Sequence, residues 1–241
     1  MRKSVGTIIY HNLANAVSIL GVLPLCLLFL ENGAQYLIPL IVYNNIMDDL
    51  DGILAAKLHI KSEFGAILDN VCDAFTHTLF IMLVAMWYAD LGNGVNVVSI
   101  AIVLSGLAAA TALLLRVVTR LSPNLVTGTG SATNELMRHL LFVLLLSNHY
   151  EFNPAPVLIA TFVLHAASML APFQMPYLIR SLAKSATAVI LVNVALVVAW
   201  LFPSTLPVIA GCFIGTYLCS FLVGGSRWFQ QTKPEVPITE Q

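Results

Sequence analysis

Five aspartates lie in two stretches that otherwise have the composition of membrane-spanning helix. They belong to the segment DDLDGILAAKLHIKSEFGAILDNVCD, which begins at Asp48 and ends at Asp73. A carboxylate within the hydrocarbon of a bilayer costs roughly 2.5–3.5 kcal/mol even on the lenient insertion scale. Such residues persist only where they face a polar cavity, pair with cations or bind a metal ion. This cluster is therefore the first place to look for chemistry.

Helical spacing brings four of these carboxylates toward one place. Asp48 and Asp51 are three residues apart and share a helix face, and Asp69 and Asp73 are four apart and share another. The connection near residues 57–63 is short, so the two helices are expected to be antiparallel neighbours. At 1.5 Å per residue, Asp51 and Asp69 then lie at a similar depth, on the order of 10 Å from the helix ends. The spacing predicts one pocket that opens to the cytoplasm.

Like charges gathered in this way require neutralisation by protons or cations. Oxygen ligands without His or Cys select hard divalent ions such as Mg²⁺, Mn²⁺ or Ca²⁺. A pair of such ions between carboxylates forms a clamp for a diphosphate or a transferring phosphoryl group. Asp49 points about 100° away from Asp48 on the same helix and is expected to lie outside the cluster.

Small and basic residues surround the carboxylates. Gly52 and Gly65 each remove a side chain beside the cluster, which lets a ligand or a neighbouring backbone come close. Lys57 and Lys61 stand at the expected mouth of the pocket, where they would meet phosphate charge.

The segment resembles the signature of the CDP-alcohol phosphotransferase family, D-x2-D-G-x2-A-R-x8-G-x3-D-x3-D. The typed positions that match, with every spacing kept, are Asp48, Asp51, Gly52, Ala55, Gly65, Asp69 and Asp73. One position departs, because the family's Arg is Ala56 here, with Lys57 directly after it. A less specific match lies in the first helix, where NAVSILG contains Asn15 and Ser18.

The resemblance implies an enzyme that cleaves the diphosphate of a CDP-linked donor, passes the phosphoalcohol moiety to an acceptor hydroxyl and releases CMP. By position, Asp48, Asp51 and Asp69 would hold a pair of divalent ions, Mg²⁺ or Mn²⁺. Asp73 would help bind metal and act as the general base. The residues expected to bind CDP are Asn15, Ser18, Gly52, Ala55, Lys57, Lys61 and Gly65.

The length of 241 residues and the expected eight spans are similar to the phosphatidylserine and phosphatidylcholine synthase branch, which uses CDP-diacylglycerol. The stretch APFQMPYLIRS favours serine as the acceptor, whereas DAFTHTLF lacks the S-F-G run expected in a serine enzyme. Choline, glycerol or inositol phosphate stay open as acceptors. Two other readings also stay open: a homologue that binds nucleotide without turnover, because of Ala56, and a cation-coupled transporter.

Four further residues are candidates for binding the acceptor or a lipid phosphate. Arg116 and Arg120 are four residues apart at the inner end of the fourth span. Basic residues commonly anchor a helix at this side of the membrane, which is one explanation of the pair. Charge-assisted hydrogen bonds to a phosphate or carboxylate are the sharper hypothesis. In TGTGSATNELMRH, Asn134 and Arg138 are candidates for lining an acceptor site, while Ser131 or Thr133 is expected to cap the next helix.

The composition places the whole chain in a membrane. Hydrophobic residues make up 59% of it, charged residues 10%, and the mean hydropathy is +0.87, whereas about a quarter of a soluble domain is charged. A net charge of −1 provides no field for nucleic acid. A span needs about 20 apolar residues. We predict an all-α fold with eight spans, at about 12–30, 36–57, 66–88, 94–117, 133–149, 155–178, 184–202 and 206–224.

The basic residues support this count. With the N-terminus in the cytoplasm, all 11 Lys and Arg fall on the inner side or at inner helix ends. The expected outer loops near 31–35, 89–93, 150–154 and 203–205 contain none. The first helix is expected to be retained, because its apolar run is too long for a cleaved signal peptide.

We therefore expect a transmembrane domain over 1–229 and a disordered cytoplasmic tail over 230–241. Both termini and the active site would face the cytoplasm, in the plasma membrane. The partners would be CDP-diacylglycerol, a small polar alcohol and membrane lipid, with no nucleic acid. The family resemblance also suggests a homodimer.

Overall fold

The fold is all-α, as predicted. The computed structural model describes residues 9–122, 130–176 and 186–232. Within these ranges the regular elements are helices, without a β-strand, and one isolated bridge joins Gly130 to Gln174.

Each predicted span contains one α-helix. In chain order the helices are α2 (Leu13–Val22), α3 (Leu37–Lys57), α4 (Glu63–Ala89), α5 (Val97–Leu121), α6 (Thr133–Tyr150), α7 (Ala155–Met169), α9 (Ala186–Leu201) and α10 (Leu206–Gln231). Short 3₁₀ helices lie between some of them: η1 (Leu23–Phe29), η2 (Gly33–Tyr36), η3 (Leu91–Asn93) and η4 (Pro203–Thr205).

Prolines account for two of the differences in helix length. The first span changes from α-helix to 3₁₀ helix after Val22, where Pro24 lacks an N–H for the α-helical ladder. The sixth span was predicted to reach 178, but α7 ends at Met169, because Pro172 disfavours helical backbone in the residue before it. The last helix instead runs past its predicted end, to Gln231, so residues 230 and 231 of the predicted tail are helical. Residues 233–241 of that tail lie outside the described ranges.

The apolar helices are those of a membrane protein. By length and composition, α4, α5 and the segment Pro203–Gln231 are each able to cross a bilayer. Three shorter apolar segments accompany them, at Leu13–Phe29, Ala155–Met169 and Ala186–Leu201. Large apolar side chains such as Leu104 and Val118 on α5 are more than half exposed, as expected where a helix faces lipid. The number of crossings stays a prediction.

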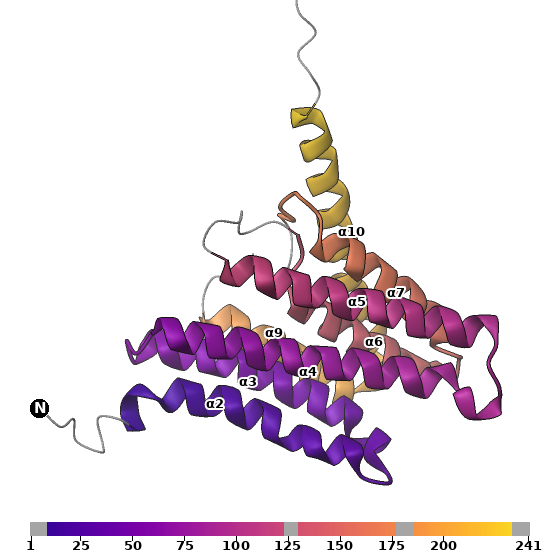
Figure 1. The fold of residues 1–241 in the computed structure, drawn as a ribbon, viewed down its shortest axis with the longest axis horizontal. Helices are drawn as coiled ribbons and strands as arrows, with labels where there is room; N and C mark the ends of the chain where they lie inside the picture. The colour runs from indigo at the N-terminus through magenta and orange to yellow at the C-terminus, as the bar shows by residue number, and fades with distance from the viewer. Residues whose placement is uncertain (1–8, 123–129, 177–185, 233–241) are drawn as a thin grey trace, which may run out of the picture.

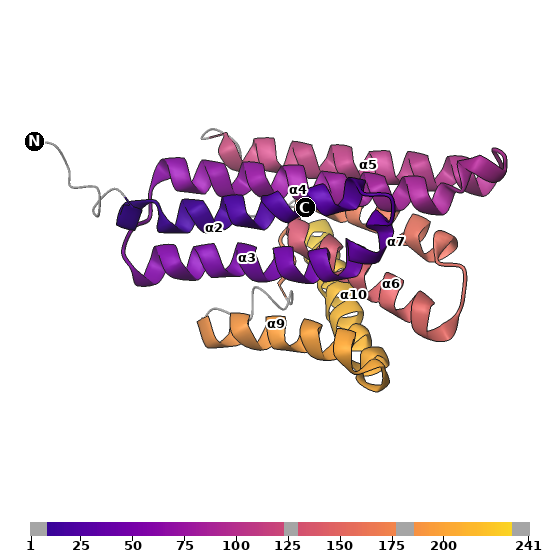
Figure 2. The ribbon, with the colours of Figure 1, turned by 90° about the horizontal axis from the view of Figure 1, so that it is seen from below.

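The helices α2, α3, α4 and α5 lie alongside one another, whereas α10 runs at a steep angle to them (Figure 1). In Figure 2 the connections from α2 to α3, α4 to α5, α6 to α7 and α9 to α10 all lie toward the right, and the connection from α3 to α4 lies at the left. None of the four connections at the right contains Lys or Arg. These five connections thus lie as the basic residues predict, while the side that faces the cytoplasm stays a prediction. Five of the basic residues lie outside the described ranges: Arg2, Lys3, Arg180, Lys184 and Lys233.

The helix α6 lies at the centre of the fold. Every residue from Thr133 to Leu145 is buried. A helix enclosed by protein can carry Glu135 and Arg138, because neither side chain meets lipid. The expected capping is wrong: the N-cap is Ala132, which makes no side-chain cap. The Oγ of Ser131 instead lies 3.1 Å from the Oγ of Ser168 on α7, and that of Thr133 donates to Asn134.

The segment after α7 packs against α10 through a glycine. A Cβ built on Gly224 would lie 2.4 Å from the carbonyl oxygen of Gln174 and 2.8 Å from the ring of Phe173. A Cβ on Gly211, in the same helix, would meet nothing within 4 Å. Position 224 therefore has no room for a side chain, whereas position 211 does.

We predict that Gly224→Ala lowers the free energy of unfolding by about 1–3 kcal/mol, the usual cost of overpacking. The matched change Gly211→Ala should be neutral, or stabilising by up to about 1 kcal/mol through helix propensity. Thermal unfolding of the two variants in the same detergent compares them directly. Equal Tm values would contradict the close approach at Gly224.

Candidate functional site: a carboxylate cavity between α3 and α4

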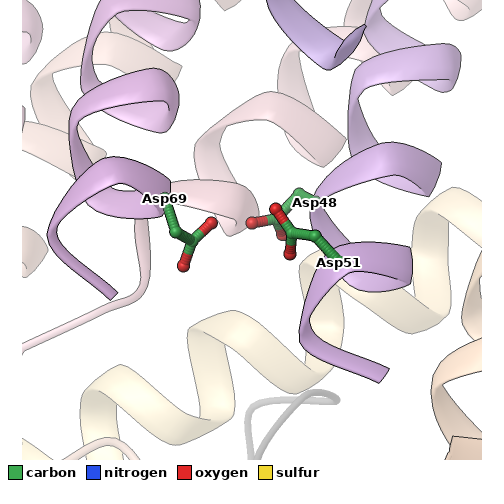
Figure 3. Close-up of side chains that lie close together, drawn as sticks. All are labelled: Asp48, Asp51 and Asp69. Atoms are coloured by element: carbon green, nitrogen blue, oxygen red, sulfur yellow. The ribbon is translucent and has the colours of Figure 1, made fainter. Parts of the chain in front are cut away.

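Three aspartates from two helices face one another. Asp48 and Asp51 project from α3 toward Asp69 on α4 (Figure 3). One oxygen of each carboxylate lies within 4.8 Å of one oxygen of the other two. Asp48 and Asp51 are buried and Asp69 is half-buried. Helical spacing therefore does bring these side chains together.

A short turn sets the two helices side by side. The chain leaves α3 at Lys57, passes through His59 in the left-handed region (φ 55°) and enters α4 at Glu63. The Oγ of Ser62 caps α4 by accepting the backbone N–H of Gly65 at 3.0 Å. The reversal places the last turns of α3 and the first turns of α4 opposite each other.

A small cavity lies among the carboxylates. It measures about 10 Å³ and is lined by Ser18, Gly21, Asn44, Met47, Asp48, Asp51, Asp69, Cys72 and Asp73. This volume suits one water-sized particle. Asp73 lines the cavity, but it is not among the three carboxylates that lie within 4.8 Å of one another. The expected set of four ligands thus divides into three close carboxylates and one beside them.

A larger pocket adjoins the small one and shares Ser18, Asp51 and Asp69 with it. It measures about 310 Å³ and is lined by Ala14, Asn15, Ser18, Asp51, Gly52, Ala55, Ile60, Lys61, Ser62, Gly65, Ala66 and Asp69. Six of the seven residues expected to bind CDP are in this lining. Lys57 is not: it is exposed at the end of α3, as is its neighbour Ala56. Of the two expected lysines, Lys61 reaches the pocket.

The two glycines act differently. A Cβ on Gly52 would meet nothing within 4 Å, so this position leaves open space in the pocket. A Cβ on Gly65 would lie 2.9 Å from the Oδ1 of Asn15 and 3.0 Å from the Oγ of Ser62. Gly65 is therefore where α4 admits a side chain from α2.

Hydrogen bonds from two other helices hold the paired aspartates of α3. The hydroxyl of Ser18 on α2 donates to Oδ2 of Asp51. The amide of Asn134 on α6 donates to Oδ2 of Asp48. Both donors are buried. Asn134 was expected to line an acceptor site, and the structure instead places its amide against a candidate metal ligand.

Arg138 also has a different position from the one expected. It is 2% exposed and lies 2.9 Å from Glu135 and 3.9 Å from Asp49, with its Nε donating to Asn45 at 3.1 Å. A guanidinium enclosed by these partners is not available to an acceptor or a lipid phosphate. The charges of Glu135 and Asp49 retain it in the protein interior.

Asn45 and Asn193 complete this buried network and were missed in the sequence. The Nδ2 of Asn193 on α9 donates to Oδ2 of Asp49 at 2.8 Å, and its Oδ1 accepts from Asn45 at 2.6 Å. Asn193 stands alone as a hydrogen-bonding amide in the apolar run of α9. That isolation is the same signal that singled out the aspartates, and it would have found this residue.

Arg116 and Arg120 differ in exposure. Arg116 is 7% exposed on α5, and its Nε has no hydrogen-bond partner. Among the described residues no carboxylate forms an ion pair with it. Arg120, one turn later, is exposed. Arg116 is thus a buried cation whose charge a ligand would complement.

The donor set suits a divalent cation. Three carboxylate oxygens face one small cavity, two of their carboxylates are oriented by hydrogen bonds, and the group is formally threefold negative. A hard cation such as Mg²⁺ or Mn²⁺ prefers such ligands and neutralises them. The residues present therefore fit a metal site.

The fold and the site together define an all-α membrane protein with an acidic pocket between two adjacent helices. A sequence model of the family "CDP-alcohol phosphatidyltransferase" matches residues 11–213. The chain belongs to this family, whose members are transferases of substituted phosphate groups. It is also similar to an uncharacterized protein of Aquifex aeolicus (strain VF5), at 36% identity over 70 residues. That match covers 29% of this chain and 35% of the relative.

Binding of Mn²⁺ should stabilise the protein. At a concentration of 100 times Kd, a ligand specific for the folded state adds about 2.7 kcal/mol to the free energy of unfolding. Asp69→Asn should abolish this increase. Because it relieves like-charge repulsion, the variant without metal should unfold at a Tm no lower than that of the wild-type protein.

The matched control is Asp90→Asn, at the left-handed residue that follows α4. It should retain the Mn²⁺-dependent increase. Thermal unfolding in chelator and in Mn²⁺ measures both effects. An increase of equal size in Asp69→Asn would contradict a metal site at these carboxylates.

Proposed function

We propose that this protein is a phospholipid-synthesising enzyme that transfers a phosphatidyl group from CDP-diacylglycerol to a small alcohol and releases CMP. Serine is the favoured acceptor, as in the phosphatidylserine synthase branch. Choline, glycerol or inositol phosphate as acceptors would require the same chemistry.

One observation carries the proposal: the small carboxylate cavity and the 310 Å³ pocket adjoin and share three residues. Pockets that bind small molecules have volumes of about 300 Å³ or more. The larger pocket thus suits part of a nucleotide donor, with the diphosphate at the carboxylates. In this arrangement Asn15, Ser18, Gly52, Ala55, Lys61 and Gly65 bind the CDP moiety.

Asp48, Asp51 and Asp69 hold the divalent ions in this proposal, with Asp73 as a further ligand. When bound, the ions neutralise charge on the diphosphate and on the CMP leaving group. Lys61 adds a positive charge at the pocket. The pocket walls from α2, α3 and α4 position the donor, so that its phosphorus lies beside Asp73.

Asp73 acts as the general base. It lines the small cavity beside the three close carboxylates, which places it next to the proposed diphosphate. The acceptor hydroxyl donates this proton as its oxygen bonds to the phosphorus, and the bond from the phosphorus to the CMP oxygen breaks. One phosphodiester replaces one diphosphate linkage, and the charges balance when the proton leaves Asp73.

Arg116 binds the anionic group of the acceptor. It lies on α5, the helix alongside α4, which carries Asp73 (Figure 1). A buried guanidinium that forms no ion pair with any described carboxylate suits a serine carboxylate by charge-assisted hydrogen bonds. Arg120 is the more exposed cation on the same helix and attracts the acceptor.

The enzyme would act at the cytoplasmic leaflet of the plasma membrane, where the donor lipid and the water-soluble acceptor meet. The connection between α3 and α4, at the mouth of the pocket, carries Lys61 and belongs to the predicted inner side. A homodimer is proposed from the family alone.

Purified protein incubated with CDP-diacylglycerol, Mg²⁺ or Mn²⁺ and each acceptor in turn should release CMP with one acceptor, serine first. Asp73→Asn should lower kcat by about 10²–10⁴-fold, the usual contribution of a positioned base. Asp90→Asn is the matched control and should retain activity. Quantifying CMP by chromatography measures the reaction.

Three outcomes distinguish an enzyme, a homologue without turnover and a transporter. Metal-dependent CMP release that is lost in Asp73→Asn supports the enzyme. Tight CDP-diacylglycerol binding without CMP, for every acceptor, indicates the homologue without turnover. Absence of both binding and release, together with cation flux in proteoliposomes, indicates a transporter.

Arg116→Met should raise KM for serine more than tenfold and leave KM for CDP-diacylglycerol within about twofold. The physical reason is the loss of hydrogen bonds to a charged group, worth about 1.5–3 kcal/mol. Arg227→Met makes the same change at an exposed position near the end of α10 and should change neither constant. Equal increases in both KM values for Arg116→Met would place this residue at the donor instead.

A further inference from the structure

We propose that Asn134 and Arg138 of α6 are positioning residues, which orient Asp48 for metal binding and hold Asp49 away from the metal. This inference rests on the proposed function, because it assigns roles around the same metal site. It replaces the expectation that both residues bind acceptor.

The contact from Asn134 fixes one oxygen of Asp48. The amide Nδ2 donates to Oδ2, and both side chains are buried, at 3% and 8% exposed. An amide is neutral and carries two donor hydrogens at every pH. It therefore restricts the rotation of the Asp48 carboxylate without competing for the cation.

Arg138 holds the same stretch of α3 one turn further along α6. Its Nε donates to Oδ1 of Asn45, three residues before Asp48, and its guanidinium lies 3.9 Å from Asp49, the residue directly after Asp48. Asp48 is thus flanked along α3 by two contacts with a single rigid side chain. A planar guanidinium with five donors suits this geometry better than a lysine would.

The same network separates Asp49 from the metal ligands. Arg138 and Asn193 both approach Oδ2 of Asp49, and Asn193 donates to it at 2.8 Å. Asp49 lines a groove between α3 and α9, away from the carboxylate cavity. Glu135, at 2.9 Å from Arg138, faces the same guanidinium. Asp49 and Glu135 therefore both face the Arg138 guanidinium, and Asp49 also accepts a hydrogen bond from the amide of Asn193.

Hydrogen-bonding partners behind a metal ligand typically contribute 10–100-fold to metal affinity. A role limited to packing would instead change the stability of the metal-free protein and leave affinity unchanged. Metal affinity and metal-free stability are therefore the two measurements that separate positioning from packing.

The experiment titrates purified full-length protein with Mn²⁺ and measures free Mn²⁺ by electron paramagnetic resonance. Asn134→Leu keeps the approximate shape of the side chain and removes its donor. We expect it to raise the Kd for Mn²⁺ by about 10–100-fold. Asn70→Leu is the matched control. Asn70 lies on α4 beside Asp69, and its amide donates to Ala66 of its own helix, so its Kd should stay within about twofold of wild type.

Arg138→Lys is the second variant and retains the charge. It should also raise the Kd for Mn²⁺, because one ammonium cannot reach Asn45, Asp49 and Glu135 in the geometry of a guanidinium. The double variant Glu135→Gln with Arg138→Met removes both charges of the close pair. It should have a higher Tm in chelator than Arg138→Met alone, which leaves two buried carboxylates without their cation.

The outcomes are distinguishable. A wild-type protein that binds no Mn²⁺ overturns the metal-dependent function and this inference with it. Wild-type protein that binds Mn²⁺, with Asn134→Leu and Arg138→Lys binding equally well, overturns the inference alone. A fall in the Tm in chelator without a change in Kd assigns both residues to packing and also overturns it.

Discussion

The mutual repulsion of carboxylates in a medium that solvates charge poorly governs this structure. Asp48, Asp51 and Asp69 lie within 4.8 Å of one another, and such a group persists only with compensating charge. The structure around the carboxylates is consistent with this requirement. Donors from α2 and α6 orient the carboxylates, a tight turn sets α3 against α4, and glycines leave room beside them.

Charge compensation takes two forms in the molecule. Asp49 and Glu135 share one protein cation, Arg138, within a network of amides. Of the three close carboxylates, Asp51 accepts a hydrogen bond from a neutral hydroxyl and Asp48 accepts one from a neutral amide. The protein thus divides its buried acids into a self-contained group and a group suited to an exchangeable ion. Within two turns of α3, Asp49 therefore belongs to the Arg138 network, whereas Asp48 and Asp51 belong to the candidate metal site.

Much of this was predictable from the sequence, because local spacing determines it. The face shared by Asp48 and Asp51 follows from 3.6 residues per turn, and the short turn after Lys57 follows from the interval between apolar runs. Five of the seven signature positions, Asp51, Gly52, Ala55, Gly65 and Asp69, line the larger pocket. These features depend on neighbours within about 25 residues, where helix geometry leaves little freedom.

The remainder depends on contacts between distant segments. Asn134 and Asp48 are 86 residues apart, and Asn193 and Asp49 are 144 apart. No periodicity in the sequence relates such positions, so Arg138 and Asn134 were assigned to an acceptor. The direction of α10 likewise involves contacts with distant segments, such as that of Gly224 with Phe173 and Gln174, and hydropathy carries no information on tilt.

The enclosed position of α6 bears on how the chain is made. Glu135, Arg138 and Asn134 occupy the first two turns of a helix whose middle, residues 140–146, is apolar. Each charged residue opposes partitioning from the translocon into lipid. Their partners on α3 come earlier in the chain and are synthesised first. An earlier helix thus offers α6 the polar surface that lipid lacks.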